Sequence, residues 1–570
     1  MKHMLNSKLK NLVLLVFVFS IVFQTNLIAS SGKGNVVLKA MEEELGRSMQ
    51  ILGKKGTPPP YFIGYRITEN RRINISAAYG SLSSCSERHS RILDVDVRVG
   101  SHKLDNSHAI RGSYDFNFSI PVEISVEDDP DAIKSTIWLE TDRRYKAAVE
   151  KLIKVKANLG VMVKEEDQSD DFSKEKPRVY AGETETVSTD TASWKKKLKE
   201  YSALFNSFPD IYSSRVTFSI EAKNKYFVNS EGSSLQHGYT FWRMDIFART
   251  KAEDGMELYK FKTFDGRLLE TLPDQKTIKT AVQQLANDLS ALREAPLMVP
   301  FTGPAILTGP ASGVFFHEIF GHRIEGHRQK DESDGQTFTR KLNEQILPTH
   351  ISVTDDPTLK TYGDTDLNGH YLFDDEGVKA ERVEVVKNGI LKNFLMSRSP
   401  IDNFPRSNGH GRAQAGRAPV SRQGNLIIES TKSVPVEKLR QMLVEECKVQ
   451  GKTYGLLFDD VVGGFTFTGR FIPQAFNVTP ITVYRVYVDG RPDELVRGVD
   501  LIGTPLTSFS KIIACSDKFG VFNGTCGAES GGVPVSAVSP HVLTTQIEVQ
   551  KKHKESEKPP VLPPPERREK

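Results

Sequence analysis

Three histidines and two glutamates fall within one short stretch of the 570-residue chain, His317-Glu318-Ile-Phe-Gly-His322-Arg-Ile-Glu-Gly-His327. A histidine followed directly by a glutamate, with a second histidine about one helical turn later, is the pattern that a hydrolytic zinc site requires. Two imidazoles hold the metal, and the glutamate, which is not a ligand, accepts a proton from the attacking water. The pattern predicts a Zn²⁺ site with His317 and His322 as ligands and Glu318 as general base.

The two histidines are five residues apart, which leaves about 140° between them on an ideal α-helix. Both can reach one ion only if the helix is locally wider, so we expect a π-type turn, a distortion that occurs mostly at functional sites. Gly321 lowers the steric cost of such a turn. The strand-like residues 304–308 precede it, and Gly309-Pro310 favours a helix start. The alternative is a group of unrelated surface histidines.

A third ligand must come from this stretch or from elsewhere in the chain. Within the stretch, His327 and Glu325 are candidates. Cys526 stands out among the cysteines because flanking glycines in Gly524-Thr-Cys-Gly527 expose its thiol at a tight turn, where a metal would ionise it. Disulfides are the alternative use of the cysteines in an exported chain, with Cys515 and Cys526 the nearest pair. The four cysteines are Cys85, Cys447, Cys515 and Cys526.

Residues 1–31 have the pattern of a secretory signal peptide: three lysines, an apolar run over residues 12–23, and small residues at the exit. The run is too short to cross a bilayer, since 12 helical residues span roughly 18 Å of a roughly 30 Å core. We therefore predict an exported protein, periplasmic or extracellular, with no stable membrane span after signal removal. The alternative is an uncleaved membrane anchor.

The formal net charge of +4 comes from the two ends of the chain. The leader carries +3, and residues 551–570, a tail rich in proline and charge that we predict to be disordered, carry another +3. Residues 32–550 are left with −2, so the folded part has no basic footprint for nucleic acid. The overall composition is ordinary for a globular protein and excludes collagen-like and multi-span membrane proteins.

The pattern along the chain predicts an α+β N-terminal domain at residues 32–299 and a β-rich C-terminal domain at residues 300–550. Turns are expected at Asn229–Gly232 and Glu253–Gly255. Predicted helices cover Val36–Leu52, Thr141–Leu159, Trp194–Leu204, Lys276–Arg293, a segment from about Pro310, and Val436–Val449; predicted strands include Tyr61–Arg66, Ile92–Val99 and several runs over Arg215–Phe264.

Several further motifs follow the histidine stretch in a fixed order, and together with it they resemble the TldD/PmbA family of metalloproteases, once called modulators of DNA gyrase. The resemblance runs from about Gly303 to Val549. The motifs are Asp374-Asp375-Glu376-Gly377, Val386-Lys-Asn-Gly, Gly411-Arg412, Pro419, Arg422 with Asn425, Gly463-Gly464, Gly498 to Gly503, and the Cys526-Gly turn running into Val533-Pro534-Val535.

This resemblance implies zinc ligands His317, His322 and Cys526, with Glu318 as general base. It also implies an α+β N-terminal domain, a β-barrel-like, mostly antiparallel C-terminal domain, and a dimer with a second copy or with a TldE/PmbA-like homologue. The family's catalytic subunit degrades unfolded or short peptides, and this chain, which keeps the motif, resembles that TldD-like subunit. His327 stands where the family usually has aspartate, so it is the alternative metal ligand. The export signal also departs from cytosolic members.

We therefore predict a zinc-dependent peptidase that acts on unfolded proteins or short peptides. His410 and Arg412, in a glycine-rich loop, are candidate substrate-binding residues, unless the loop is only a solvated turn. One alternative is a non-catalytic peptide-binding or scaffold subunit of a TldD/PmbA-type complex. Another is a cysteine hydrolase that uses Cys526 with His322.

Overall fold

The computed structural model describes residues 35–110, 120–160, 166–470, 476–503 and 508–552, together with residues 559, 560, 562 and 565. The predicted signal peptide, residues 1–31, lies outside these residues, and so does most of the predicted tail at 551–570. In this described part of the chain, no helix combines the length and the apolar character needed to cross a membrane.

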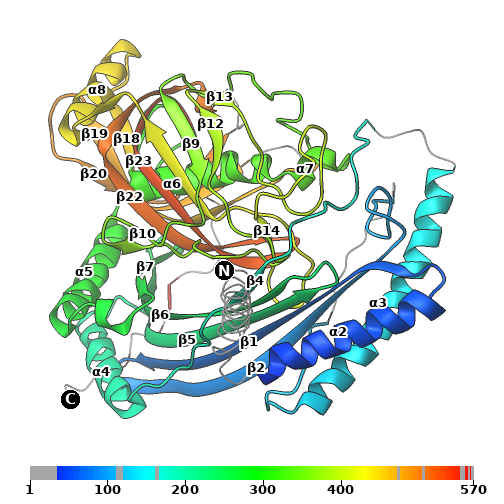
Figure 1. The fold of residues 1–570 in the computed structure, drawn as a ribbon. Coiled ribbons are helices and arrows are strands. Elements are labelled where there is room, and N and C mark those ends of the chain that lie inside the picture. The colour runs from blue at the N-terminus through cyan, green and yellow to red at the C-terminus, as the bar shows by residue number, and fades with distance from the viewer. Residues whose placement is uncertain are drawn as a thin grey trace, which may run out of the picture.

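The first half of the chain forms one seven-stranded sheet in the order β3-β2-β1-β5-β6-β4, with β7 paired to β6 (Figure 1). Its long strands pair as antiparallel neighbours over almost their whole length. Gly232 and Gly255 have φ of 101° and 88°, which favours glycine, at the two predicted turns. The strands are β1 (Pro60–Ala78), β2 (Ser81–Val99), β3 (Val122–Glu123), β4 (Val179–Ala181), β5 (Ser213–Asn229), β6 (Ser234–Lys251) and β7 (Glu257–Gly266).

Four helices pack against this sheet: α2 (Val36–Lys55), α3 (Pro130–Leu159), α4 (Thr191–Ala203) and α5 (Gln275–Glu294). Successive side chains of a strand point to opposite faces. In β1 the odd-numbered residues, such as Ile67 and Ile75, join the hydrophobic clusters formed with these helices. The even-numbered Arg66 instead reaches the C-terminal half, where it donates to the backbone oxygen of Asp375 at 3.1 Å. One face of the sheet is thus core, and the other meets the second half of the protein.

The second half contains a twelve-stranded sheet that is mostly antiparallel and curled. Its path runs β13-β12-β9-β16-β23-β21-β19-β18-β8, and β8 pairs back to β23, so the last strands close on themselves. The strands are β8 (Phe301–Leu307), β9 (Ile351–Asp355), β12 (Val383–Lys387), β13 (Ile390–Leu391), β16 (Asn425–Ser430), β17 (Ser433–Val434), β18 (Tyr454–Thr466), β19 (Phe476–Tyr487), β20 (Glu494–Val496), β21 (Val499–Gly503), β22 (Ile512–Ala528) and β23 (Gly531–Lys551).

Two helices pack against this sheet. Helix α6 (Gly309–Ile319) packs against β18, β22 and β23 and contributes Phe315 and Phe316 to the largest hydrophobic cluster. Helix α8 (Val436–Val449) buries Leu439 and Leu443 in a separate cluster with β8 and β23. The smaller elements are η1 (Leu204–Ser207), η2 (Leu269–Thr271), η3 (Gly321–Ile324), α7 (His327–Lys330), and the pairs β10 (Thr361–Tyr362) with β11 (Thr365–Asp366) and β14 (Gly411–Arg412) with β15 (Val420–Ser421).

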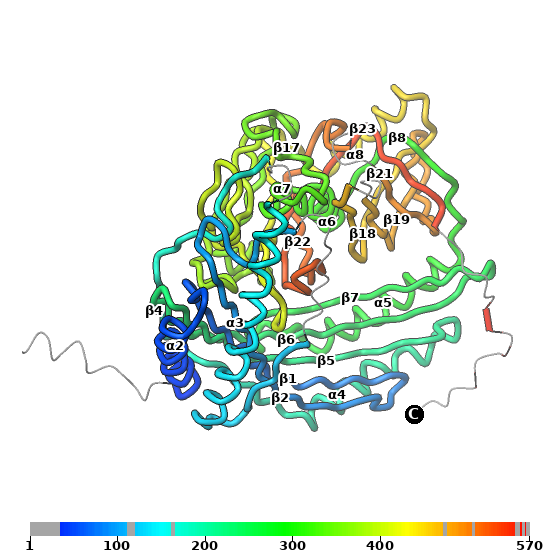
Figure 2. Tube along the Cα trace, turned by 90° about the vertical axis from the view of Figure 1, so that its right-hand side faces the viewer, coloured from blue at the N-terminus to red at the C-terminus, as the bar shows by residue number. Residues whose placement is uncertain are grey.

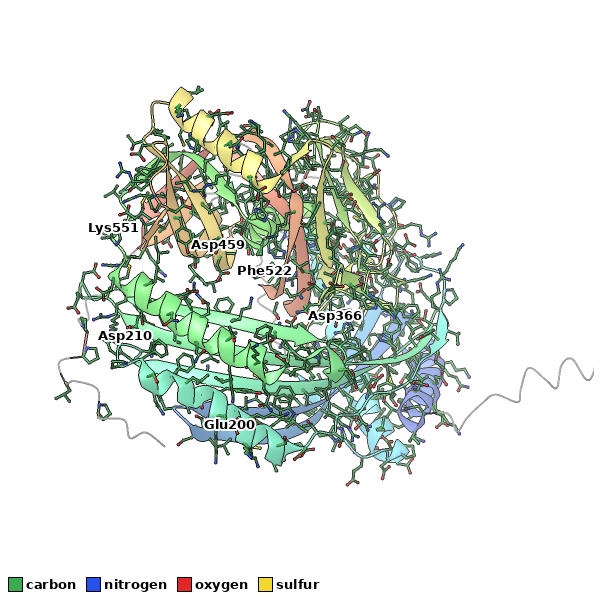
Figure 3. The ribbon with its side chains drawn as sticks, turned by 90° about the vertical axis from the view of Figure 1, so that its left-hand side faces the viewer. Glu200, Asp210, Asp366, Asp459, Phe522 and Lys551 are labelled. Atoms are coloured by element: carbon green, nitrogen blue, oxygen red, sulfur yellow. The ribbon has the colours of Figure 1, made fainter. Side chains whose placement is uncertain are left out.

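The two halves lie face to face, with the long strands of the N-terminal sheet running beneath the C-terminal half (Figure 2). Seen from another side, Asp210 lies in the N-terminal half, while Asp459 and Phe522 lie across from it in the C-terminal half (Figure 3). Ion pairs join the halves directly: Lys225 Nζ lies 2.7 Å from Asp375 Oδ1. The contact between the halves is therefore electrostatic as well as steric.

The predicted α+β class is confirmed, and the predicted helices are found with small changes at their ends. The exception is α3, which begins at Pro130 rather than Thr141. Asp129 accepts from the backbone nitrogens of Asp131 and Ala132, and proline occupies the first helical position. These two residues form a strong helix-start signal that precedes the predicted start at Thr141. The exposed Trp138 and Leu139 interrupt the apolar pattern there, which hid this first part of the helix.

Candidate metal centre and active-site cleft

The histidine stretch is built from a helix end and a 3₁₀ turn. Helix α6 ends at Ile319, Phe320 has φ −109° and ψ −52°, and η3 follows directly. The nitrogen of Arg323 donates to the oxygen of Phe320 at 2.9 Å, an i to i−3 bond. The predicted π-type turn is wrong, because the chain breaks the α-helix and tightens instead of widening it. This break brings His322 next to His317, with ring centroids 5.1 Å apart.

Gly321 is needed at this break because another segment approaches it closely. A Cβ on residue 321 would lie 1.9 Å from the side-chain oxygen of Gln423. Gln423 is fully buried and comes from the loop before β16. The glycine therefore makes room for a neighbouring side chain, rather than easing a wide turn as expected.

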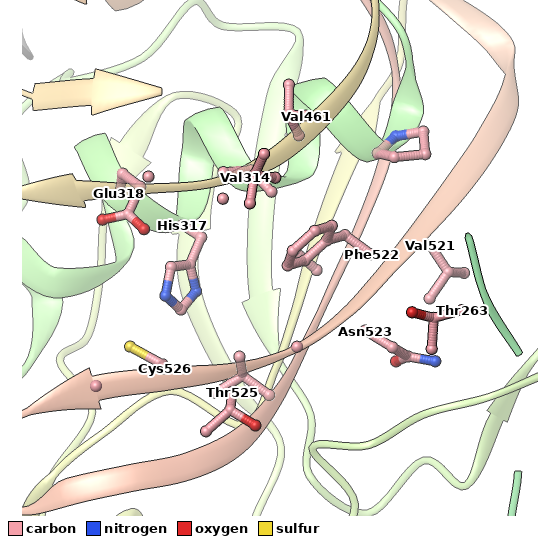
Figure 4. A pocket seen from close by; sticks show the side chains of 18 of the residues that line it. Thr263, Val314, His317, Glu318, Val461, Val521, Phe522, Asn523, Thr525 and Cys526 are labelled. Atoms are coloured by element: carbon pink, nitrogen blue, oxygen red, sulfur yellow. The ribbon is translucent and has the colours of Figure 1, made fainter. Parts of the chain in front are cut away.

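Cys526, near the end of β22, meets the two histidines from the opposite side. Its Sγ lies 3.3 Å from Nε2 of His322, and one ligand atom from each of Cys526, His317 and His322 falls within 4.8 Å of the others. All three side chains are buried. The close-up shows His317 projecting from α6 toward the sulfur of Cys526 (Figure 4). A sulfur and two imidazole nitrogens thus converge on one point.

His327 and Glu325, the other candidate ligands, do not join this group. Nε2 of His327 lies 2.5 Å from Oε1 of Glu529. Oε2 of Glu325 lies 3.3 Å from Nδ1 of His322, on the side of the ring away from Cys526. A carboxylate in this position fixes the orientation and tautomer of a ligating histidine. Glu325 is therefore an orienting residue in this arrangement.

Two arginines hold Glu325 and the cysteine strand in place. Nε of Arg328 donates to Oε2 of Glu325 at 2.8 Å, and Nε of Arg422 lies 3.5 Å from Oε1 of Glu325. Arg422 also donates to the backbone oxygen of Cys526 at 2.7 Å and to the hydroxyl of Ser530 at 2.8 Å. One buried guanidinium therefore ties the cysteine turn to the carboxylate that orients His322.

The charges of the centre suit a metal cation. Burial alone would raise the pKa of the Cys526 thiol, but His322 and His317 hold that pKa well below its usual range. The pKa of His322 is in turn raised well above its usual value, despite burial, by Cys526 and Glu325. For Glu325, burial is overcome by His322 and Arg328, and its pKa falls to about 2. The deprotonated sulfur is the form that a metal site requires, and His322 must release its extra proton when a cation takes its place beside that sulfur.

Glu318 lies beside the three donors without being one of them. Its Oε2 is 4.0 Å from Nε2 of His322. Burial raises the pKa of Glu318 above its ordinary value, against the lowering effect of the two histidines. Strand β18 crosses over this side chain at Gly464, where a Cβ would lie 2.7 Å from Cγ of Glu318. The site therefore holds a carboxylate with raised proton affinity next to the donor group, as a general base requires.

The centre opens into a cleft of about 1000 Å³ between the two halves of the protein. His317, Glu318, His322 and Cys526 lie in its wall. The N-terminal sheet contributes Trp242, Arg243 and residues 261–265, and the C-terminal half contributes residues 460–469, 521–529 and Asp364–Asp366. Phe522 and Thr263 are seen further along the cleft in Figure 4.

An aromatic pair lies on the wall nearest to Glu318. Phe465 and Phe467, directly after Gly464, are 51% and 44% exposed, and their rings meet edge to face at 5.5 Å. Exposed apolar side chains that adjoin one another and are rimmed by polar residues mark interaction sites or ligand-binding grooves. These two phenylalanines therefore offer an apolar surface to whatever occupies the cleft.

The two predicted substrate-binding residues lie away from this cleft. His410 is fully buried, with Nε2 3.2 Å from Asp355 and Nδ1 3.0 Å from Asn408, so it has no access to a substrate. Arg412 is buried against the ring of Tyr371 and donates to the backbone oxygen of Gln423. The prediction that His410 binds substrate is therefore wrong, and Arg412 does not line this cleft. Because both residues are buried, the alternative of a solvated turn is wrong as well.

All four cysteines are unpaired in the structure. Cys515 and Cys526 lie on the same strand, β22, so the alternative of a disulfide between them is wrong. Eleven residues of strand correspond to roughly 35 Å, far beyond the reach of a disulfide. Cys515 instead belongs to the hydrophobic core.

Comparison with known proteins finds a family whose sequences match the part of the chain that contains the centre. Residues 301–551, which contain all of the centre, match the PmbA/TldA metallopeptidase C-terminal domain. This part of the chain is therefore similar to the C-terminal metallopeptidase domain of the PmbA/TldA proteins.

Individual proteins with similar sequences or structures give the same indication. A metalloprotease of Archaeoglobus fulgidus is 32% identical over 42% of this chain and 51% of its own length. A zinc metalloprotease TldD homolog of Saccharolobus solfataricus is 24% identical over 43% of this chain and 51% of its own. The chain thus spans about half the length of these curated relatives. The structure of TldE from Thermococcus kodakarensis shares the fold, with a TM-score of 0.58 and 13% identity over 90% of this chain and all of that one.

Proposed function

We propose that this protein is a zinc-dependent peptidase that hydrolyses unfolded or short peptides. One observation carries the proposal: His317, His322 and Cys526 present their ligand atoms within 4.8 Å of one another, with Glu318 beside them in the wall of an open cleft. A purely structural metal site would be closed and would have no need of a carboxylate with a raised pKa. The metalloprotease names of the relatives support the same reaction class.

The donor set fits zinc. Zinc prefers imidazole nitrogen and thiolate sulfur, and catalytic sites provide three protein ligands and keep a fourth position open. The described structure offers two imidazoles and one thiol with a strongly lowered pKa, and one relative is named a zinc metalloprotease. When bound, zinc would polarise the scissile carbonyl and lower the pKa of water from 15.7 to about 7.

The protein's own residues would then position and move the proton. Glu318 accepts the proton of the attacking water and returns it to the leaving amine. Glu325 and Arg328 keep the ring of His322 oriented with Nε2 toward Cys526. Gly464 leaves space for the Glu318 side chain under β18.

The cleft supports a peptide as substrate. It is about 1000 Å³ in volume, and its walls come from both halves of the protein. Phe465 and Phe467 would contact apolar side chains next to the scissile bond, which unfolded chains expose and folded proteins bury.

The family resemblance and the leader extend the proposal to assembly and location. We propose that the protein works as a dimer, with a second copy or with a TldE/PmbA-like homologue, and that it is exported to the periplasm or beyond. The TldE structure shares this fold, which supports a partner of the same fold. The lysines and apolar run of residues 1–31 support export.

Metal removal tests the proposed function. The purified protein is expected to contain one zinc per chain and to cleave an unstructured peptide, to lose activity on chelation, and to regain it with zinc. Activity that survives complete zinc removal would identify the cysteine hydrolase. A zinc-loaded protein that binds the peptide without cleaving it would identify the non-catalytic subunit.

A further inference from the structure

A second cavity, of about 560 Å³, lies between the two halves and adjoins the strand pair that carries the metal ligand. Val533, which lines it, is the cross-strand partner of Cys526. Its wall contains six cationic side chains, namely Arg88, Lys223, Lys225, Arg267, Lys360 and Arg412. Only three acidic side chains line it: Glu185, Asp374 and Asp375.

Two of these three acids are already satisfied by the protein itself. Asp374 accepts from the backbone nitrogens of Val378 at 2.8 Å and Gly411 at 2.9 Å. Asp375 accepts from Lys225 at 2.7 Å and from the backbone nitrogen of Ala413 at 2.9 Å. Asp375 therefore neutralises Lys225, and Asp374 pairs with no cation of the cavity.

Lys223 pairs with Glu221 at 3.2 Å. The other four cations of the wall have no carboxylate partner within the described structure: Arg88, Arg267, Lys360 and Arg412. The guanidinium of Arg267 donates to the backbone oxygens of Leu367 at 3.3 Å and His370 at 3.2 Å. Its Nε is buried and has no hydrogen-bond partner. A buried donor left without a partner is costly unless a ligand satisfies it. Arg88 and Lys360 are exposed and stand at the rim.

Two histidines of the same wall are held neutral by burial and by neighbouring cations. Burial and the charge of Lys225 lower the pKa of His237 to about 4. Burial and the charge of Arg267 likewise lower the pKa of His370 to about 4. Both rings are therefore neutral near pH 7, and the positive charge of the cavity comes from its arginines and lysines alone.

We propose that this cavity binds a small anion with at least two negative charges, carried by carboxylate or phosphate groups. Guanidinium and ammonium groups are the partners that recognise both kinds of oxyanion. The cavity volume falls in the range of about 300–1,000 Å³ that is typical of small-molecule sites. Tyr239 and Tyr371 add aromatic surface for the carbon skeleton of an organic anion.

Titration calorimetry with two simple probes tests this site. Glutarate and inorganic phosphate are titrated separately into the full-length protein at constant ionic strength. We expect at least one of them to bind saturably with one site per chain and more weakly at higher salt. The double variant Arg88→Ala/Lys360→Ala is expected to weaken binding by at least about tenfold, since each residue supplies a charge-assisted contact. Both residues are exposed, so the variant should fold normally.

Lys262→Ala is the matched control, because Lys262 is an exposed lysine in the wall of the other cleft. It should bind both probes as the wild type does. Glu318→Gln should also bind them unchanged, so a failure of the proposed peptidase leaves this test intact. Binding of glutarate alone assigns a carboxylate ligand, and binding of phosphate alone assigns a phosphate ligand. The proposal is overturned if neither probe binds up to tens of millimolar, or if Lys262→Ala weakens binding as much as the double variant does.

Discussion

At the scale of single residues, Cys526 and the two histidines depend on each other. The sulfur is 3.3 Å from His322, and its low pKa is set by the imidazoles. His322 in turn is oriented by Glu325, whose charge is held by Arg328. Removing any one donor therefore disturbs the protonation of the others as well as the number of ligands.

Cys526→Ser should lose most of its bound zinc, because a serine hydroxyl does not ionise as a thiol does at this position. His327→Gln should keep one zinc per chain, since His327 pairs with Glu529 and not with the donor group. Elemental analysis of both purified variants measures this. If Cys526→Ser keeps its zinc while His327→Gln loses it, the ligand assignment must pass to His327.

The residues that the sequence predicted are those whose function follows from local spacing. His317, Glu318 and His322 form one motif, and Cys526 stands out by its neighbouring glycines, although it is buried in strand β22 and not exposed at a turn as predicted. Local spacing could not show that Gln423 and Gly464 belong to the centre. Gln423 packs against Gly321, and Gly464 packs against Glu318, and in both pairs the two residues are more than 100 positions apart in the chain. Phe465 and Phe467 look like core residues in sequence, and only the structure shows that they line a cleft.

At the scale of elements, the centre depends on three elements of secondary structure that pack closely against one another. Helix α6 ends at Ile319, η3 turns His322 back, and β18 crosses above Glu318 at Gly464. A Cβ at residue 464 would also lie 2.6 Å from the backbone oxygen of Asn477 on β19. The strand and the helix therefore have no spare space between them.

Gly464→Ala is expected to lower peptidase activity by at least about tenfold while zinc stays bound, because the methyl group displaces Glu318 and a misplacement of about 1 Å can cost 10²-fold. The comparison is Gly469→Ala, in the same cleft wall, where the nearest atom to a new Cβ is at 3.8 Å. Rates and zinc content of the two variants are measured together. Equal activity of both variants would show that β18 does not position Glu318.

The extent of individual elements was predicted well where periodicity and end signals agreed. Helix α8 matches its predicted range, and α5 differs by one residue at each end. The π-type turn was wrong because helical geometry alone cannot show that a chain ends its α-helix at Phe320. The full length of β1 was missed because its charged middle, around Arg71-Arg72, breaks the apolar alternation that predicts strands.

At the scale of the whole molecule, acidic and basic side chains connect the two halves around the Asp374–Glu376 turn. Asp375 meets Arg66 from β1 at 3.7 Å and Lys225 from β5 at 2.7 Å. Glu376 accepts from the backbone nitrogen of Arg398 at 2.6 Å. No local pattern in the sequence predicts this contact, since its partners lie 150 and 309 residues apart. This contact is one of several that join the two halves, together with the ion pairs Arg398–Glu231 and Arg497–Asp254.

Stability should therefore depend on pH through Glu376. Burial raises its pKa from 4.5 to about 7, so the folded protein binds this proton more tightly than the unfolded chain. Its contribution to the free energy of unfolding is full below pH 4.5 and is lost as the pH rises through 7, by roughly 1–3 kcal/mol. Glu376→Gln, which does not titrate, should lose less stability between pH 5 and pH 8. Urea midpoints at the two pH values measure this, and equal losses in variant and wild type would contradict it.

The most direct test of the peptidase mechanism is a single substitution, Glu318→Gln, assayed with zinc content and peptide cleavage on the same sample. The variant keeps the size and shape of the side chain but cannot accept a proton. The mechanism predicts one zinc per chain, as in the wild type, with the cleavage rate reduced by about 10² to 10⁴-fold. A variant that holds its zinc and cleaves the peptide at the wild-type rate would contradict the role of Glu318 as general base.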